Sequence, residues 1–286
     1  MKYADAVKIH CENLREFSAR AELSEAQKKN SVRQLAKLYK ESRGGEDLIS
    51  VYRGFKALSP DISLSELAEF CVVLTNELSK KDRKISQRER NNNANVAAGA
   101  HGKVSVVRNE YNERAFSEFS KIITHAKAVY TTSFDSAFEA VTDGKCEYCI
   151  SPVESSKSGR LFGFYSLLDR SELKICAACT LDSENESIRY ALIGNSFPDR
   201  AKFTDVTDLE FSVISDEGSF PSDIPRALPI FGAEIIKLDS LPLEYNNIRQ
   251  KYFFTLRLPA ENLRALHLYL SAEHEQYSPI GAYPTV

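Results

Sequence analysis

The fold of this chain is decided by residues 133–175, which read SFDSAFEAVTDGKCEYCISPVESSKSGRLFGFYSLLDRSELKI. Within this segment Ser133–Val141 has helical periodicity, whereas the runs YCISPV and LKICAACTL are β-branched or aromatic, as in strands. Upstream, KVSVV and KAVYTT have the same strand character and are separated by a helical stretch, Glu113–His125. Strands that alternate with helices predict a mostly parallel α/β sheet that begins at Lys103.

The C-terminal part of the chain predicts a second arrangement. Leu209, Phe211 and Val213 alternate as in a half-buried strand. The predicted elements that follow are a helix at 224–231, strands at 234–238 and 252–258, a helix at 260–270 and a strand at 277–282. The order β-α-β-β-α-β is that of a ferredoxin-like sandwich. Such a module buries one face of its sheet under two helices and leaves the other face free to pair, often with a second copy.

Residues 1–90 predict a helical domain. Apolar residues recur at helical spacing within residues 7–17, 32–39 and 64–78. Ser63 and Glu66 have the spacing of a capping box at the start of the third helix. A basic run at 79–90 and the tract NNNANVAAGAHG follow, and the absence of periodicity in this tract predicts a linker over 91–102.

The composition is that of a globular protein. Of 286 residues 43% are hydrophobic and 27% are charged, which excludes collagen-like and wholly disordered chains. No apolar stretch approaches the roughly 20 residues that span a bilayer. Charged side chains occupy the N-terminus where a signal peptide needs an apolar core, so we expect a cytoplasmic protein whose six cysteines are reduced. The net charge of −3 is too balanced to require nucleic acid or a membrane as partner.

Two cysteine pairs have a spacing that is typical of structural zinc sites, Cys146 with Cys149 and Cys176 with Cys179. The second pair lies inside an apolar, strand-like run. Because residues three apart in a strand point to opposite faces, these two thiols cannot share an ion. We therefore interpret all four as buried thiols and expect neither a metal nor a cofactor.

Several short motifs within this segment occur in the order known from one enzyme family. They are Ser133-Phe134, Ala140-Val141, the run from Gly144 to Tyr148, and Pro-Val-Glu-Ser-Ser-Lys-Ser-Gly at 152–159. In this order and spacing, Ser133–Ile175 resembles the catalytic domain of prephenate dehydratases. The cysteines then fall on strands of that domain.

The C-terminal part extends the resemblance. Asp-Ser-Leu-Pro at 239–242 looks like the Glu-Ser-Arg-Pro motif of the ACT domain, a βαββαβ regulatory module. Gly-Ala-Tyr-Pro at 281–284 looks like the Gly-Ser-Tyr-Pro with which the family ends. The resemblance implies phenylalanine as an effector and a homo-oligomer formed through this module. It also implies residues that bind the effector: Ser222, Asp223, Ile224, Asp239, Ser240, Leu241 and Pro242.

The resemblance implies a two-lobed, periplasmic-binding-protein-like α/β domain. It also implies the decarboxylating dehydration of prephenate to phenylpyruvate, in phenylalanine biosynthesis, with the substrate in an interlobe cleft. The reaction needs a donor for the departing hydroxide and cations for the carboxylates. The expected domains are a helical domain at 1–90, a linker at 91–102, the dehydratase-like domain at 103–204 and the ACT-like domain at 205–286.

By its position in the family's Thr-Arg-Phe motif, Arg189 is implied to hold a substrate carboxylate. The motif here is Ile188-Arg189-Tyr190, so Ile188 offers no hydroxyl and the neighbouring Ser187 is the candidate donor. These give Ser187 and Arg189 as the catalytic candidates. The substrate-binding candidates are Ser117, Ser133, Glu154, Ser155, Ser156 and Tyr190.

Three functions stay open on the sequence. The first is an active prephenate dehydratase that uses Ser187 or a lysine such as Lys157 as donor. The second is a catalytically silent sensor of the same fold that binds a small aromatic carboxylate, which the missing hydroxyl at Ile188 favours. The third is a sensor whose N-terminal helices bind a protein or a nucleic acid.

Overall fold

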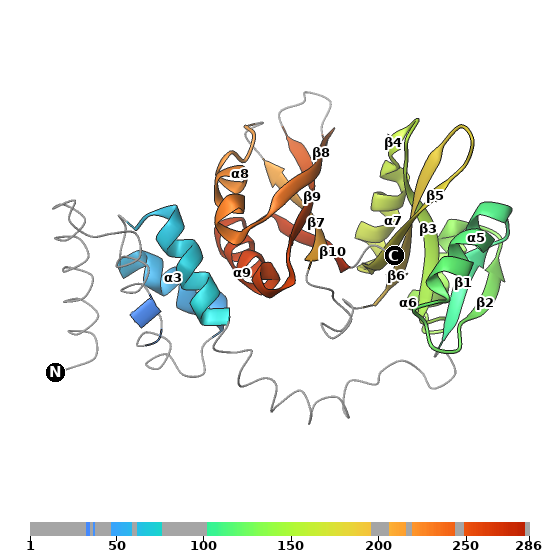
Figure 1. Ribbon diagram of the computed structural model, residues 1–286, viewed down its shortest axis with the longest axis horizontal. Coiled ribbons are helices and arrows are strands. Elements are labelled where there is room, and N and C mark those ends of the chain that lie inside the picture. The colour runs from blue at the N-terminus through green and yellow to red at the C-terminus, as the bar shows by residue number, and fades with distance from the viewer. Residues whose placement is uncertain are drawn as a thin grey trace. The chain divides into compact units, whose positions relative to one another are not determined.

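The computed structural model describes residues 33, 34, 37, 47–58, 62–75, 102–195, 206–215, 219–243 and 249–283 (Figure 1). These residues form two compact units. The smaller unit holds the described residues before 76 together with 219–234 and 261–277, and the larger unit holds the rest. The helix predicted at 7–17 and the linker, apart from Gly102, lie outside the described residues. Of the helix predicted at 32–39, residues 33, 34 and 37 are described and are helical.

The first half of the larger unit follows the predicted alternation of strands and helices. Both of the first two helices begin at a polar cap: the side chains of Asn109 and Ser133 accept hydrogen bonds from the backbone N–H groups of Asn112 and Ser136. The elements are β1 (Lys103–Val107), α5 (Glu110–Phe119), β2 (Lys127–Thr131), α6 (Phe134–Thr142), β3 (Tyr148–Ser155), β4 (Gly159–Arg160), α7 (Phe162–Ser171), β5 (Lys174–Asp182) and β6 (Ser187–Gly194).

The strands of this half form one sheet in the order β2-β1-β3-β6-β5, with β4 paired to β3. The predicted parallel arrangement is correct for β1 with β2 and with β3. It is wrong for β6, which runs antiparallel to both β3 and β5. Only residues 183–186 connect β5 to β6. A connection this short makes a hairpin, because parallel neighbours need a crossover of about a dozen residues or more.

Two clusters of buried side chains cover the two faces of this sheet. Phe138 of α6 and Phe164 and Tyr165 of α7 belong to one cluster, and Phe119 of α5 belongs to the other. The half is therefore a mixed α/β layer structure, as the sequence predicted. The two-lobed form is not confirmed, since every strand of the described residues 102–195 belongs to a single sheet.

The second half has the predicted order β-α-β-β-α-β. Its strands continue the same sheet in the order β10-β7-β9-β8, and β10 pairs in parallel with β5 through Gly281 and Ile175. The elements are β7 (Val206–Ser215), α8 (Asp223–Ala227), η2 (Leu228–Phe231), β8 (Glu234–Pro242), β9 (Gln250–Pro259), η3 (Ala260–Asn262), α9 (Leu263–Glu273) and β10 (Tyr277–Tyr283).

Both faces of β7 are buried, which the alternation alone did not predict. Leu209 and Phe211 occupy one face, and Asp208 and Glu210 on the opposite face are also 2–4% exposed. Helix α7 covers this second face on the neighbouring strand β9. There the ring of Phe253 contacts α7, with its centroid 5.1 Å from that of Tyr165. The expectation of a free sheet face is therefore wrong, because the chain's own α7 occupies it.

The smaller unit is held by aromatic packing and one carboxylate. The rings of Phe55 in α3 (Leu48–Leu58) and Phe70 in the helix of residues 64–75 stack at 3.8 Å between centroids. From α3, the Tyr52 hydroxyl donates to Glu273 of α9 at 2.7 Å. The predicted capping box is present: the backbone N–H groups of Ser63 and Glu66 each donate to the other's side chain. None of the described helices is long and apolar enough to cross a membrane.

Gly281 allows the close approach of β10 to β5, which makes a substitution there informative. A Cβ at this position would lie 2.7 Å from the Ile175 Cβ and 2.8 Å from the Tyr283 ring. We expect Gly281→Ala to lower the free energy of unfolding by about 1–3 kcal/mol through overpacking. Urea denaturation measures it. Gly163→Ala in α7 is the control, because a Cβ there meets nothing within 4 Å and should not destabilise. Equal stability of the two variants would contradict the β5–β10 contact.

Candidate functional site

On strand β6, the side chains of Arg189 and of its two neighbours lie on opposite faces of the sheet. Ile188 and Tyr190 lie on the face covered by α5, where Tyr190 is 3% exposed and Ile188 packs against the same cluster. Ala191, two residues from Arg189, belongs to the cluster on the other face. The position without a hydroxyl, Ile188, is thus part of the core. Burial raises the pKa of Tyr190 to about 12, so its phenol is neutral.

Arg189 is half-buried beside two residues of other strands. Its Nη2 donates to Asp208 Oδ2 of β7 at 3.4 Å and to the Tyr283 hydroxyl of β10 at 3.3 Å. Both contacts are long, since charge-assisted N–H···O bonds are about 2.7–2.9 Å. Among the described residues, the guanidinium makes no hydrogen bond through Nε or Nη1. These two nitrogens therefore carry the N–H groups of Arg189 that remain for a ligand. Burial alone would lower its pKa, but the negative groups around it raise the pKa above the ordinary value.

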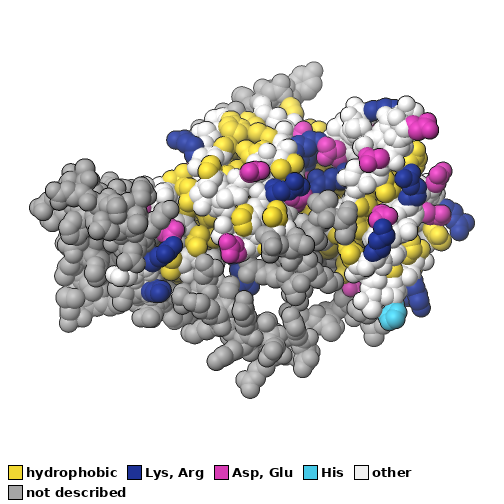
Figure 2. Space-filling view, viewed as in Figure 1, with side chains coloured by type: hydrophobic (Ala, Val, Ile, Leu, Met, Phe, Trp, Pro, Cys, Tyr) yellow, Lys and Arg dark blue, Asp and Glu magenta, His cyan; other side chains and the backbone are white. Residues whose placement is uncertain are grey.

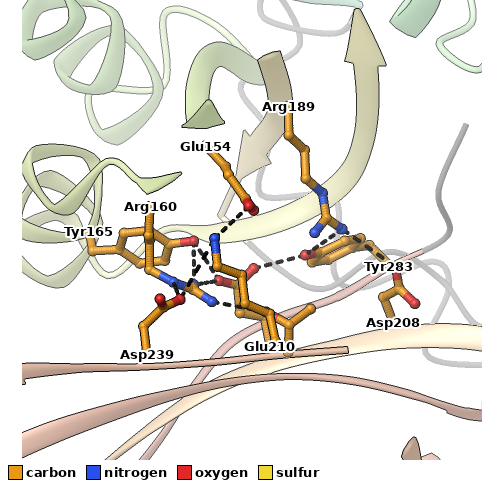
Figure 3. A network of polar contacts seen from close by, with 10 residues as sticks. Glu154, Arg160, Tyr165, Arg189, Asp208, Glu210, Asp239 and Tyr283 are labelled. Carbon is orange, nitrogen blue, oxygen red and sulfur yellow. Dashed lines mark hydrogen bonds and ion pairs between the residues drawn. The ribbon is translucent and has the colours of Figure 1, made fainter. Parts of the chain in front are cut away.

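Arg160 lies at the centre of a buried polar network (Figure 3). Its side chain is 2% exposed and forms an ion pair with Glu210 of β7, whose side chain is 3% exposed. Arg160 also donates to Asp239 of β8 at 2.8 Å and to Thr255 of β9 at 3.0 Å. Burial opposes the charge of Arg160, but Glu210, Tyr165 and Asp239 together outweigh burial and raise the pKa of the guanidinium. One arginine from β4 thus contacts three strands of the C-terminal module.

The carboxylate of Glu210 accepts hydrogen bonds from three side chains. Besides Arg160, it accepts hydrogen bonds from the hydroxyls of Tyr165 at 2.5 Å and Tyr283 at 2.8 Å. A buried carboxylate needs this number of donors, because burying an unpaired charge costs several kcal/mol. Burial raises the pKa of both phenols, which therefore act as neutral donors.

The rim of the network carries further ion pairs. Lys237 of β8 pairs with Glu154 of β3 at 2.5 Å, and Arg257 of β9 pairs with Asp208 at 3.0 Å. Together with Arg160, Arg189, Glu210 and Asp239, these side chains make four cations and four carboxylates. Their formal charges cancel, so a carboxylate ligand would be recognised by local geometry and not by a net positive field.

The serines of the predicted substrate loop bond to the protein itself. Ser155 donates to Glu186 and accepts from the backbone N–H groups of Lys157 and Ser158, both at 3.1 Å. The Ser156 hydroxyl accepts from the backbone N–H of Ser187 at 3.0 Å. These contacts are turn chemistry that joins the end of β3 to the start of β6.

Ser187, the candidate donor, has its hydroxyl in use. It donates to Asp182 Oδ1 at 2.5 Å across the β5–β6 hairpin. A hydroxyl that already donates a hydrogen bond to a carboxylate is not free to protonate a departing hydroxide. Of the other predicted residues, Ser133 caps α6, and Ser117 is exposed on α5 without a hydrogen bond among the described side chains.

Residues 108–207 match the family model described as prephenate dehydratase. This part of the chain is therefore similar to prephenate dehydratases. No curated protein matches the chain.

Among solved structures, prephenate dehydratase from Streptococcus mutans is similar over 64% of this chain and 98% of its own, with 18% identity and a TM-score of 0.50. GqqA, described as a novel type of quorum quenching acylase, matches with 20% identity and a TM-score of 0.49 over 64% and 95%. Prephenate dehydratase in complex with L-Phe from Arthrobacter aurescens has 12% identity and a TM-score of 0.47 over 63% and 89%. At these identities only a shared fold follows.

The residues of the predicted effector site fall into two groups. Ser222, Asp223 and Ile224 lie at the start of α8, in the smaller unit, where Ser222 accepts from Arg226 at 3.2 Å and Ile224 is fully buried. Asp239–Pro242 end β8, in the larger unit, where Asp239 accepts from Arg160. Ser240 and Pro242 are exposed, and Leu241 packs against the core of the dehydratase-like half.

Two hollows of the described surface, of about 410 and 390 Å³, border α7 of the larger unit and include neither Arg189 nor the serine loop. The first is lined by three carboxylates, those of Asp135, Glu139 and Glu172, against one cation, Arg170. This charge disfavours an anionic substrate. Figure 2 shows basic and acidic side chains intermixed on the described part of the face in view, without the single-sign patch that nucleic acid binding requires.

Sequence reasoning did not identify Arg160, Glu210, Asp208 or Tyr165 as part of a site. One signal was present. In β7, Asp208, Glu210 and Ser212 alternate with apolar residues, which was interpreted as a solvated face, although all three are at most 4% exposed. Nothing local distinguishes a solvated polar row from one that pairs with a distant arginine.

The Arg160–Glu210 pair gives a direct stability test. We expect Arg160→Met to lower the free energy of unfolding by about 3–5 kcal/mol, because it leaves Glu210 buried without its cation. Adding Glu210→Gln should cost less than the two single changes together. Urea denaturation measures all three variants. Lys145→Met is the control: it removes a pair with Asp143 that is 73% and 53% exposed and should change little. Additive losses would contradict the network.

Proposed function

We propose that this protein is a member of the prephenate dehydratase family that binds a small aromatic carboxylate at Arg189 and does not dehydrate it. The observation that carries the proposal is that neither Ile188 nor Ser187 has a hydroxyl that is free to donate to the departing group. The arginine of the motif is kept, while Ile188 offers no hydroxyl and Ser187 donates to Asp182. Loss of hydroxide from prephenate needs such a donor, since hydroxide is a poor leaving group.

The geometry of Arg189 supports binding. Its Nε and Nη1 keep N–H groups that can donate to a carboxylate oxygen. The raised pKa keeps the group charged at any physiological pH. The Tyr283 ring, whose centroid is 5.6 Å from the Arg189 Cζ, gives the site an aromatic neighbour. These features suit prephenate, phenylpyruvate or phenylalanine as ligands.

The connection between β5 and β6 supports the lack of turnover. A substrate enclosed between two lobes is shielded from water, which strengthens every electrostatic contact with the reacting groups. Here β5 and β6 form a hairpin, and all described strands of the dehydratase-like half belong to one sheet. A ligand on such a lobe has fewer groups around it to align a departing carboxylate and hydroxide.

The regulatory and oligomeric parts of the proposal concern the βαββαβ module. We propose that it is an ACT-like domain over 205–286, following a dehydratase-like domain over 103–204, in a chain related to enzymes of phenylalanine biosynthesis. The predicted helical domain at 1–90, the linker and the cytoplasmic location stay predictions. So does a role of phenylalanine as effector, for which Ser222–Ile224 and Asp239–Pro242 are the candidates.

We expect the purified protein to bind phenylpyruvate and to form none from prephenate. Turnover is followed by the appearance of phenylpyruvate, with and without phenylalanine, and binding by calorimetry. Arg189→Ala should abolish binding, because it removes the guanidinium that donates hydrogen bonds to the carboxylate. Ile188→Thr restores the hydroxyl of the motif and shows whether the scaffold can still react. Turnover by the native chain would overturn the proposal that the protein does not dehydrate prephenate. Ser187→Ala would then test Ser187 as the donor.

The exposed edge of β8 supports a homo-oligomer. Strand β8 is the last strand of the described sheet, and Ile235, Ile236 and Leu238 on it are 40–46% exposed. An open edge with apolar side chains is a template for pairing with a second copy. We expect Ile236→Lys to lower the sedimentation coefficient to that of a monomer. The control is Ile122→Lys, a change at a 38% exposed position away from this edge. A native monomer would contradict the proposal.

A further inference from the structure

The Tyr283 hydroxyl connects a residue of the family motif to the C-terminal module. It donates to Glu210 Oε2 at 2.8 Å and accepts from Arg189 Nη2 at 3.3 Å. The side chain is 1% exposed, and its ring packs beside Gly281 of the same strand. Tyr283 is therefore fixed in place before any ligand arrives, with Glu210 and Arg189 on the two sides of one oxygen (Figure 3).

Arg189 has few other restraints. Its second contact, to Asp208 Oδ2, is 3.4 Å long, and Asp208 is already paired with Arg257 at 3.0 Å. An arginine with all of its torsions free loses rotamer entropy when a ligand fixes it. A contact that fixes the guanidinium plane beforehand removes part of this cost. Both contacts use Nη2 and so leave the N–H groups of Nη1 and Nε for a carboxylate.

We propose that Tyr283 is a positioning residue, which orients Arg189 so that its Nη1 N–H groups face an incoming carboxylate. The inference rests on the proposed binding at Arg189 and adds how that binding is controlled. Because Tyr283 ends β10, a shift of this strand changes the orientation of Arg189. By thermodynamic reciprocity, a ligand on Arg189 then favours one position of the C-terminal strand.

Tyr165 supplies a matched control. Its hydroxyl donates to the same carboxylate, at Glu210 Oε1, and is equally buried. Among the described residues it contacts Arg160 and makes no hydrogen bond with Arg189. Loss of either hydroxyl removes one donor from Glu210, but only the loss of that of Tyr283 frees Arg189.

The first test is the affinity for phenylpyruvate, measured by calorimetry. We expect Tyr283→Phe to weaken binding about three- to tenfold, the usual net effect of losing one hydrogen bond. Tyr165→Phe should stay within about twofold of the wild type. Equal losses in the two variants would mean that the hydroxyls act only through Glu210 and stability, which overturns the proposal.

The second test needs no ligand. In protein with ¹⁵N-labelled arginine, the side-chain NMR signals of Arg189 are assigned by their loss in Arg189→Lys. We expect Tyr283→Phe to merge the Nη signals through faster rotation of the guanidinium, and Tyr165→Phe to leave them unchanged. Unchanged signals in Tyr283→Phe overturn the inference. Asp208→Asn is a second variant in case Tyr283→Phe does not fold, and it should keep the restrained signals because Tyr283 remains.

The two tests separate the inference from the proposed function. If the wild type binds neither phenylpyruvate nor prephenate, binding at Arg189 fails as a function, and the NMR comparison still decides whether Tyr283 orients the guanidinium. If the wild type binds and Tyr283→Phe binds equally well, the function stands and the positioning role fails.

Discussion

The buried contact between Arg160 and Glu210 is the constraint on which the larger unit depends. Each side chain is at most 3% exposed, so either charge without the other would be buried and unpaired, which costs several kcal/mol. Arg160 comes from the two-residue strand β4, and Glu210 from the first strand of the C-terminal module. Their pairing, together with Tyr165 and Tyr283, makes the polar face of that module an internal surface.

This constraint also determines what the motif residues can do. Arg189 shares Tyr283 with the buried carboxylate and is held through Nη2 only. The serines at the ends of β3 and β6 bond within the hairpin and the turn that shape the sheet. The arginine of the motif thus keeps N–H groups for a ligand while the neighbouring hydroxyls act in structure, which is the chemical basis of the proposal that the protein binds without dehydration.

Local patterns predicted most elements of the described chain, but not α3, α7, β4 or β6. Hydrophobic alternation located β7 and β9, and helical periodicity from Ser133 located α6. They failed where a long-range pairing was decisive. The direction of β6 follows from a hairpin of residues 183–186, and the polar row of β7 appears solvated until α7 and β4 are packed on it.

The sequence by itself determined most of the strands and helices, the βαββαβ order and the arginine of the motif, because these depend on residues within a few positions of one another. Only the tertiary structure decided which of the polar side chains are free. Ser155 and Ser187 are as polar as any ligand-binding residue, yet their hydroxyls donate hydrogen bonds to Glu186 and Asp182. A hydrogen bond is decided by distance in space, and residues 31 or 79 positions apart, such as Ser155 and Glu186 or Arg160 and Asp239, are brought together only by the fold.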